Sequence, residues 1–288
     1  MKPENLRRSL GELKILYKTH PRLRDVFVEG PSDARFFRWF LQELGVDSEI
    51  KVFDIDTRAE IPREKVLDVH SEVNRRGRLF ALAYEANSWE SSSRGVTCVV
   101  DADFDVLQPT NRPDNLLMTD YPALEVYGLQ PRPLNKFLAQ FGDENIRDGE
   151  EVLRVLLPTW GQLFLLRYIL HNHSDGDALV SNFPAKVIDK SGKVAVDVME
   201  LICASTRQGK EEVERLHELY EQKALVFPPA SLATVRGHDV APLLIKFLAL
   251  TKELKSVSAV ESLLRACIEL RDLIDLPLFK ALIARVSV

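Results

Sequence analysis

Cysteine is scarce in this sequence. Its 288 residues include three cysteines, Cys98, Cys203 and Cys267, which are scattered along the chain. This number and spacing exclude a disulfide framework and a zinc ribbon. Because unpaired cysteines are typical of a reducing compartment, we expect a cytoplasmic protein.

Long apolar runs are absent as well. No stretch approaches the roughly 20 consecutive apolar residues that a membrane-spanning helix needs, so we expect no membrane partner. The first residues, MKPENLRRSLGELK, are basic, but no apolar stretch follows them, and this differs from a secretory signal.

An excess of positive charge is also missing. Thirty-eight Lys and Arg residues stand against 43 Asp and Glu residues, which gives a formal net charge of −5. This balance argues against a protein that coats nucleic acid through bulk charge. It does not exclude a nuclease, because a metal site needs local carboxylates that lower the net charge.

Four short runs rich in β-branched and aromatic residues are typical of strands. They lie at 24–29, 50–55, 96–100 and 115–119. Helical spacing occupies the segments 4–18, 32–45 and 63–89. The second of these is expected to begin with Ser32 as its N-cap and to end at Gly45. Strands that alternate with helices favour an α/β fold, a parallel sheet with helices on both faces.

The pattern becomes helical after Pro131, with breaks at prolines such as Pro158. The helical segments are 132–141, 149–157, 159–171, 195–204, 209–223, 239–254, 257–273 and 276–286. We therefore predict an α/β domain over residues 1–130 and a mainly helical domain over 131–288. The segment 236–250 is a candidate to pack back on the sheet.

Acidic residues follow two of the predicted strands. Glu29 ends the first strand, and Asp101, Asp103 and Asp105 follow the third in the sequence VVDADFD. The carboxyl ends of parallel strands lie along one edge of a sheet, so we expect these carboxylates to converge. No basic partner is visible beside them, and such a cluster needs a divalent cation. Oxygen ligands favour Mg²⁺ or Mn²⁺, which points to phosphoryl-transfer or phosphodiester chemistry.

Several of the polar residues also have simple structural interpretations. Ser32 fits a helix cap, and Asp120 fits the cap of a helix that starts near Pro122. Asp239 fits the N-cap of an apolar helix that follows Gly237. The sequence HNHSDGD at 171–177 is typical of a helix end and a turn. Three arginine clusters fit either contacts with nucleic acid or solvated helical charge. These clusters are Arg7/Arg8, Arg22/Arg24 and Arg75/Arg76/Arg78.

Four segments resemble the Toprim-containing family of unknown function called DUF4435. They are VFVEGPSDARFF, VVDADFD, TDYPALEVYGL and RGHDVAPLL, in this order along the chain. The Toprim signature is a Glu-Gly after the first strand and an Asp-x-Asp after the third, which Glu29-Gly30 and Asp101-Ala102-Asp103 match. The segment TDYPALEVY resembles the acidic segment that the family carries after its next strand, with Asp120 and Glu125.

The resemblance implies a Toprim-like, Rossmann-like fold and a Mg²⁺-dependent nuclease related to the overcoming-lysogenization-defect (OLD) nucleases. It implies that Glu29, Asp101 and Asp103 are catalytic and metal-binding, with Asp105 as an outer metal ligand. Glu29 is expected as a second metal ligand or as the general acid or base. The remaining residues have supporting roles in this expectation. Asp120 and Glu125 are expected at a second metal position or as its support, and Gly30, Ser32 and His238 as phosphate contacts.

The resemblance also implies partners. Some members are toxic effectors of anti-phage defence that a separate ABC-type ATPase controls, as in the PARIS system, where the effector attacks tRNA. This chain has no GxxxxGK[ST] motif, so the ATPase would be another protein. We expect a nucleic-acid substrate, which is tRNA, another RNA or DNA. The helical region is a candidate homodimer face.

Two other functions fit the same residues. One is a non-catalytic regulatory or binding module on a Toprim fold. The other is a haloacid-dehalogenase-like phosphatase with Asp101 as its nucleophile, although Asp105 then stands where Thr or Val is expected and Glu29 has no role. A calcium loop of the EF-hand type is excluded, because Val106 stands where glycine is needed and Arg112 where glutamate is needed.

Overall fold

A computed structural model of the chain describes residues 7–46, 50–89, 95–107, 111–142, 148–174, 176–188 and 191–287. Its residues form two compact units, which are each described by themselves. The first unit contains Met1–Ala102, Pro109–Asp120 and Leu273–Val288. The second contains Asp103–Gln108 and Tyr121–Asp272. The chain therefore crosses between units more often than a single boundary at residue 130 would require.

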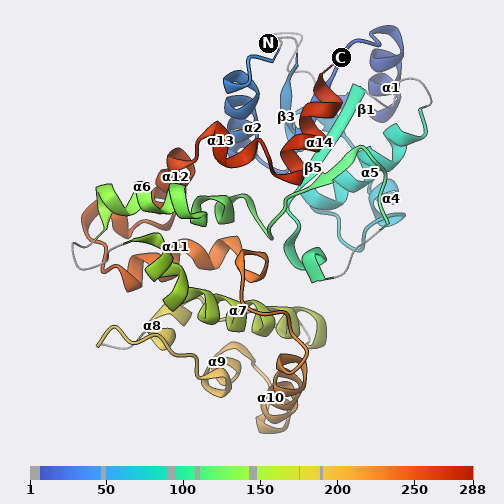
Figure 1. Cartoon of the computed structure of the whole chain (residues 1–288). Helices are drawn as coiled ribbons and strands as arrows, with labels where there is room; N and C mark the ends of the chain where they lie inside the picture. The colour runs from blue at the N-terminus through green and yellow to red at the C-terminus, as the bar shows by residue number, and fades with distance from the viewer. Residues whose placement is uncertain are drawn as a thin grey trace. The chain divides into compact units, whose positions relative to one another are not determined.

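The first unit is built on a four-stranded parallel sheet with the order β3-β2-β5-β6 (Figure 1). The strands are β2 (Asp25–Val28), β3 (Val52–Asp54), β5 (Val96–Val100) and β6 (Leu116–Met118). All residues of the two central strands, β2 and β5, are buried. Strands buried on both faces are typical of a parallel sheet that helices cover. The predicted α/β fold with a parallel sheet is confirmed.

Helices flank this sheet, with α2 and α14 on one side and α1 and α5 on the other (Figure 1). The helices of the unit are α1 (Leu10–Thr19), α2 (Pro31–Glu43), α3 (Ile55–Arg58), α4 (Arg63–Leu67), α5 (Arg75–Asn87) and α14 (Pro277–Val286). A small parallel pair, β1 (Arg8–Ser9) with β4 (Ala59–Glu60), was not predicted. Its two-residue strands are too short to show a periodic pattern.

The helix predicted over 4–18 begins later, at Leu10. Ser9 caps it, because the Ser9 hydroxyl accepts from the Glu12 backbone N–H and the Glu12 carboxylate accepts from the Ser9 N–H. Residues 4–6 lie outside the described residues.

The single helix predicted over 63–89 is wrong, because two helices, α4 and α5, occupy this segment. Asn74 separates them, since its side chain accepts a hydrogen bond from the Gly77 N–H at 2.8 Å and so starts a new helix. A Cβ atom on Gly77 would lie 2.3 Å from the Glu72 carbonyl oxygen, so the turn between the helices needs glycine there.

The N-cap of α2 is Gly30, and the prediction of Ser32 in this place is wrong. Pro31 occupies the first helical position, where its missing N–H has no cost, and Ser32 falls inside the first turn. The Asp33 carboxylate accepts from the Gly30 N–H at 3.0 Å. The predicted end at Gly45 is confirmed, because this residue has φ +69°, which glycine adopts without strain.

Helix α14 returns to the first unit from the end of the chain. The Phe279 ring lies 4.7 Å from that of Phe40, measured between centroids. Arg285 Nε donates to Thr97 Oγ1 of β5 at 3.0 Å, and the Leu278 N–H donates to Asp120 Oδ1 at 3.0 Å. The segment of the C-terminal half that belongs with the sheet is therefore α14, whereas residues 236–250 belong to the second unit.

The second unit is helical, as predicted. Its longer helices are α6 (Pro131–Phe141), α7 (Gly149–His173), α9 (Val198–Ser205), α10 (Lys210–Ala224), α11 (Gly237–Phe247) and α12 (Val257–Cys267). Shorter ones are η3 (Asp103–Leu107), η4 (Leu124–Leu129), α8 (Phe183–Val187), η5 (Leu232–Thr234), η6 (Lys252–Lys255) and α13 (Leu270–Leu273). The break predicted at Pro158 is wrong, because α7 runs through it. Burial of residues such as Trp160 and Phe164 after the proline outweighs its cost of roughly 3 kcal/mol.

A buried ion pair connects two helices of this unit. Asp239 on α11 is 1% exposed, and its carboxylate accepts three hydrogen bonds from Arg167 on α7, at 2.6, 2.8 and 3.1 Å. The Trp160 indole N–H donates to the Asp239 carbonyl oxygen at 3.1 Å. Asp239 was predicted as an N-cap, but the helix begins at Gly237. The Asp239 carboxylate instead pairs with the Arg167 guanidinium in the interior of the unit.

No helix within the described ranges is long and apolar enough to cross a membrane.

Removal of the Phe279 ring should destabilise the first unit. This side chain is fully buried among Phe36, Phe37 and Phe40, so Phe279→Ala leaves a cavity and is expected to lower the free energy of unfolding by about 3–5 kcal/mol. Calorimetry with resolved transitions measures this loss. The control Leu225→Ala removes an apolar side chain that is 87% exposed and should change stability by less than about 0.5 kcal/mol. An equal effect of both variants would contradict the prediction.

The buried Asp25 should make the stability of the first unit depend on pH. Burial raises the pKa of Asp25, although the hydrogen bond from the Tyr17 hydroxyl and the charge of Arg58 act in the opposite direction. The folded unit therefore keeps this proton at pH values where the unfolded chain has released it. Its stability falls as the pH rises through that window.

We expect Asp25→Asn to remove this fall, because the amide does not ionise. The melting temperature of the wild-type chain should drop more between about pH 4 and pH 7 than that of the variant. Groups that titrate in both proteins affect both melting temperatures equally, so the difference between the two proteins reports on Asp25. Parallel melting curves across this range would show that Asp25 does not act in this way.

Candidate active site

Glu29 and Asp101 lie together at the carboxyl edge of the sheet. They follow β2 and β5, which pair in parallel with Phe27 opposite Cys98. The Asp101 N–H donates to Glu29 Oε1 at 3.2 Å, and both residues are half-buried. The pairing of the central strands thus joins two acidic residues that are 72 positions apart in the sequence.

Asp103 and Asp105 lie in η3, at the start of the second unit. Asp103 has φ +45°, a left-handed conformation that costs a non-glycine residue about 1–3 kcal/mol. Its N–H donates to the Pro122 carbonyl oxygen at 2.9 Å. Aspartate tolerates this conformation better than most residues, so the sequence meets the backbone requirement here.

Phe104, between these two aspartates, anchors η3 within the second unit. Its ring centroid lies 5.2 Å from that of Phe164, 5.6 Å from Tyr168 and 5.5 Å from His171. The Arg236 guanidinium lies 5.3 Å from the same ring. His171 and His173 are at the end of α7, as the helix-end interpretation of HNHSDGD predicts, although Asp175 lies outside the described residues.

The structure does not bring the three expected carboxylates together as a preformed set of metal ligands. Among the residues that the structure describes, no three His, Cys, Asp or Glu side chains form a group that could hold a metal ion. Asp103 follows Asp101 by two residues, so chain connectivity alone keeps their Cα atoms within about 7 Å. The carboxylates of Glu29 and Asp101 are oxygen donors, the type that Mg²⁺ binds.

The two residues expected at a second metal position have structural partners. Asp120 accepts from the N–H of Leu278, so it caps α14 and not a helix near Pro122. Glu125, in the second unit, forms an ion pair with Arg265 at 2.7 Å, and each side chain is 18% exposed. A Cβ atom on Gly237 would lie 2.7 Å from Glu125 Oε2, so this glycine makes room for the carboxylate.

His238 is exposed near the start of α11, and its charge acts on Glu261. Burial and then repulsion by Glu125 raise the pKa of Glu261, while His238 and Arg265 oppose this rise. The acidic and basic groups here belong to the second unit and hold η4, α11 and α12 together.

Three arginines at the start of α5 reach the edge that carries Glu29 and Asp101. Arg75 Nε donates to Asp56 Oδ2 at 2.7 Å, and Arg78 forms a second ion pair with the same carboxylate. Arg76 donates to the carbonyl oxygen of Asp101. A guanidinium thus lies beside the backbone of Asp101, and it comes from another helix, so no sequence pattern beside the motif indicates it.

The same contacts control the charge of Asp56. Burial acts to raise the pKa of Asp56, but the hydrogen bonds and charges of Arg75 and Arg78 outweigh it and hold the pKa below its usual value. Asp56 lies two residues after the Asp54 that ends β3, so it belongs to the same sheet edge. It was not among the predicted site residues, although an acidic residue directly after the predicted strand 50–55 was the available signal.

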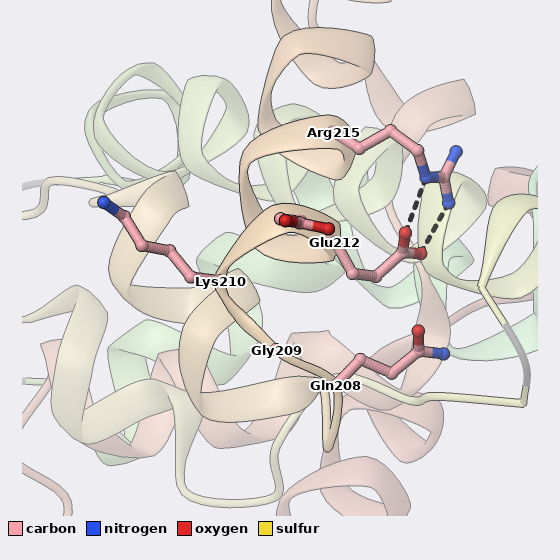
Figure 2. A pocket seen from close by; sticks show the side chains of 6 residues that line it. Gln208, Gly209, Lys210, Glu212 and Arg215 are labelled. Carbon is pink, nitrogen blue, oxygen red and sulfur yellow. Dashed lines mark hydrogen bonds and ion pairs between the residues drawn. The ribbon is translucent and has the colours of Figure 1, made fainter.

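A pocket in the second unit contains none of these residues. It opens at the start of α10 and is lined by Gln208, Gly209, Lys210, Glu211, Glu212 and Arg215 (Figure 2). Figure 2 shows the Glu212 carboxylate facing the Arg215 guanidinium, with Nε and Oε2 at 2.6 Å. This pair and the exposed lysine are typical of a solvated helix end, and we assign no chemistry to the pocket.

Comparison with known proteins does not identify a family. No protein-family model matches this chain, and no curated protein matches it either. The resemblance to DUF4435 therefore rests on the four sequence segments and stays a prediction.

The left-handed backbone of Asp103 predicts an order of stability among variants. Asp103→Gly and Asp103→Asn tolerate φ +45° and should keep the melting temperature close to that of the wild-type chain. Asp103→Val should lower the free energy of unfolding by about 1–3 kcal/mol, because β-branched residues are strained there. Asp105→Val is the matched control without a left-handed backbone. An equal loss at both positions would show that the backbone of Asp103 is not the cause.

Proposed function

We propose that this chain is a Mg²⁺-dependent endonuclease with a Toprim-like fold, which cleaves phosphodiester bonds in nucleic acid. The observation that carries the proposal is the contact between Glu29 and Asp101 at the carboxyl edge of the two central strands. Ligands of open parallel sheets bind at this edge. The Glu-Gly and the Asp-x-Asp thus follow neighbouring strands of one sheet, as a shared metal site requires.

The carboxylates of Glu29 and Asp101 would hold Mg²⁺ or Mn²⁺, with Asp103 and Asp105 as further oxygen ligands. The cation supplies neutralising charge for a phosphate and lowers the pKa of a bound water. Mg²⁺ is commonly held by one or two carboxylates, waters and substrate phosphates, so it does not need a complete protein shell. The donor type of these residues fits this cation.

The neighbouring groups orient the acidic residues. The Asp101 N–H holds one oxygen of Glu29, and Arg76 holds the Asp101 carbonyl oxygen. The Ala102 N–H donates to Thr119 Oγ1 at 2.8 Å, which ties the segment after β5 to the segment after β6. In this arrangement Glu29 is suited to accept a proton from an attacking water, as a general base.

The biological role follows only from the sequence resemblance. On that basis we propose a toxic effector of cytoplasmic anti-phage defence, controlled by a separate ABC-type ATPase. Its substrate would be tRNA, another RNA or DNA, and its helical unit would offer a homodimer face. His238 and Ser32 would be contacts of the substrate phosphates in the same proposal.

One observation favours a second candidate, a non-catalytic binding module. Within the described part of the chain no three potential ligands are grouped, and Asp120 and Glu125 are engaged in structural contacts. Such a module would bind nucleic acid without cleaving it. The haloacid-dehalogenase-like alternative gives Glu29 no role, whereas here Glu29 contacts the Asp101 backbone.

Substitution of the two paired carboxylates should abolish cleavage. Glu29→Gln and Asp101→Asn keep the shape of each side chain but remove its charge, so each should lower metal-dependent cleavage by at least about 100-fold. The assay uses plasmid DNA, single-stranded DNA and total tRNA with Mg²⁺ or Mn²⁺. Glu43→Gln, at the exposed end of α2, is a charge-matched control that should retain full cleavage.

Full cleavage by folded Glu29→Gln and Asp101→Asn would contradict the proposal. Binding without cleavage by the wild-type chain, on all substrates, would instead favour the binding module. Hydrolysis of a small phosphate ester through an aspartyl-phosphate would favour the phosphatase.

A further inference from the structure

Two guanidinium groups share one carboxylate at the carboxyl edge of the sheet. Arg75 uses its Nε and Arg78 one Nη to bind the two oxygens of Asp56. A guanidinium has five N–H donors, so each arginine keeps four for another acceptor. The side chains are 51% and 28% exposed, which leaves them within reach of a ligand.

Arg75 and Arg78 lie at a helix position where a positive charge is unfavourable. They lie in the first turn of α5, at the positive end of the helix dipole, and this turn contains no acidic residue. Asn74 already caps the helix, so the arginines are not needed to satisfy its backbone. Asp56 bridges the two guanidiniums, and the charges of Asp54 and Asp33 also act on Arg75. The donors that Asp56 does not use remain available to an anionic ligand.

Gly30, which follows Glu29, lies beside the same guanidinium. A Cβ atom on Gly30 would lie 3.6 Å from Arg75 Nη1 and 3.6 Å from Asp33 Oδ2, which is ordinary contact. The backbone of Gly30 has φ −145°, which any residue adopts. The fold therefore does not require glycine here, whereas close approach of a ligand to the backbone would.

We propose that Arg75 and Arg78 form a cradle for one phosphate of a nucleic-acid strand, and that Gly30 leaves room for this phosphate beside them. The inference rests on the proposed function, since it names the substrate contact of the same site. Arginine presents paired N–H donors that match two phosphate oxygens, and Asp56 fixes the direction of both side chains. The carboxylates then hold the cation, and the cradle holds the strand.

Binding of a labelled single strand of DNA or RNA, followed by fluorescence anisotropy, tests the cradle separately from cleavage. The measurement is made in EDTA and in Ca²⁺ over a range of NaCl concentrations. Each neutralised phosphate contributes about 0.7 to the slope of log K against log salt for single strands. Because the cradle holds one phosphate, loss of both arginines should reduce the slope by about 0.7, and at about 0.1 M salt Arg75→Ala/Arg78→Ala should bind about 5-fold more weakly.

Three variants distinguish the specific loss of the cradle from a general loss of positive charge and from misfolding. Arg35→Ala/Arg63→Ala removes two exposed arginines of the same unit and should bind like the wild-type chain. Arg75→Lys/Arg78→Lys keeps the charge but not the paired donors, and should retain the slope while binding less tightly. Gly30→Ala should keep the melting temperature and weaken binding.

Equal DNA and RNA binding would assign the contact to the phosphate alone, and stronger binding of one of them would identify the substrate.

The inference is overturned if Arg75→Ala/Arg78→Ala binds like the wild-type chain, or if the charge-matched control weakens binding equally. In either case, metal-dependent cleavage that is lost in Glu29→Gln would leave the proposed function intact. If the wild-type chain neither binds nor cleaves any strand, both proposals fail.

Discussion

The parallel pairing of β2 with β5 is the interaction on which the first unit depends. It joins segments that are about 70 residues apart, and every backbone group of these buried strands must find its partner in the sheet. The pairing determines which residues meet at the carboxyl edge. It also obliges helices to cover both faces, since strands without polar faces cannot face water.

The edge combines acidic and basic groups with different tasks. Glu29 contacts the Asp101 backbone, while Arg75 and Arg78 share Asp56 and so point in set directions. A chain with a net charge of −5 thus carries a local group of guanidiniums at this edge. Overall charge is a poor guide to such a local group, because attraction at short range depends on the few nearest charges.

The strands and most helices could be predicted from the sequence, because their signals are local. The run VTCVV predicts β5 at its observed bounds, and Gly45 marks the end of α2. The failures are of another kind. Pro158 lies inside a helix because neighbours distant in sequence bury α7, and the arginines of α5 reach Asp101 only after the sheet has formed. Neither the burial of α7 nor the contact between α5 and Asp101 can be predicted from a pattern along the chain.

The same limit applies to the candidate site. The acidic strand ends are visible in the sequence, and the structure brings Glu29 and Asp101 together. The partners of Asp120, Glu125 and Asp239 lie 158, 140 and 72 residues away, so their structural roles could not be inferred from neighbours. A carboxylate that caps a distant helix has the same local sequence as one that binds a metal.

The return of α14 to the first unit has a consequence for biosynthesis. Phe279, Arg285 and the backbone of Leu278 contribute to the sheet unit from the far end of the chain. During translation, these residues leave the ribosome only after all of the second unit has been made. The sheet and its acidic edge therefore cannot reach their final packing before the second unit has been synthesised. Any activity of this edge would appear only after that point.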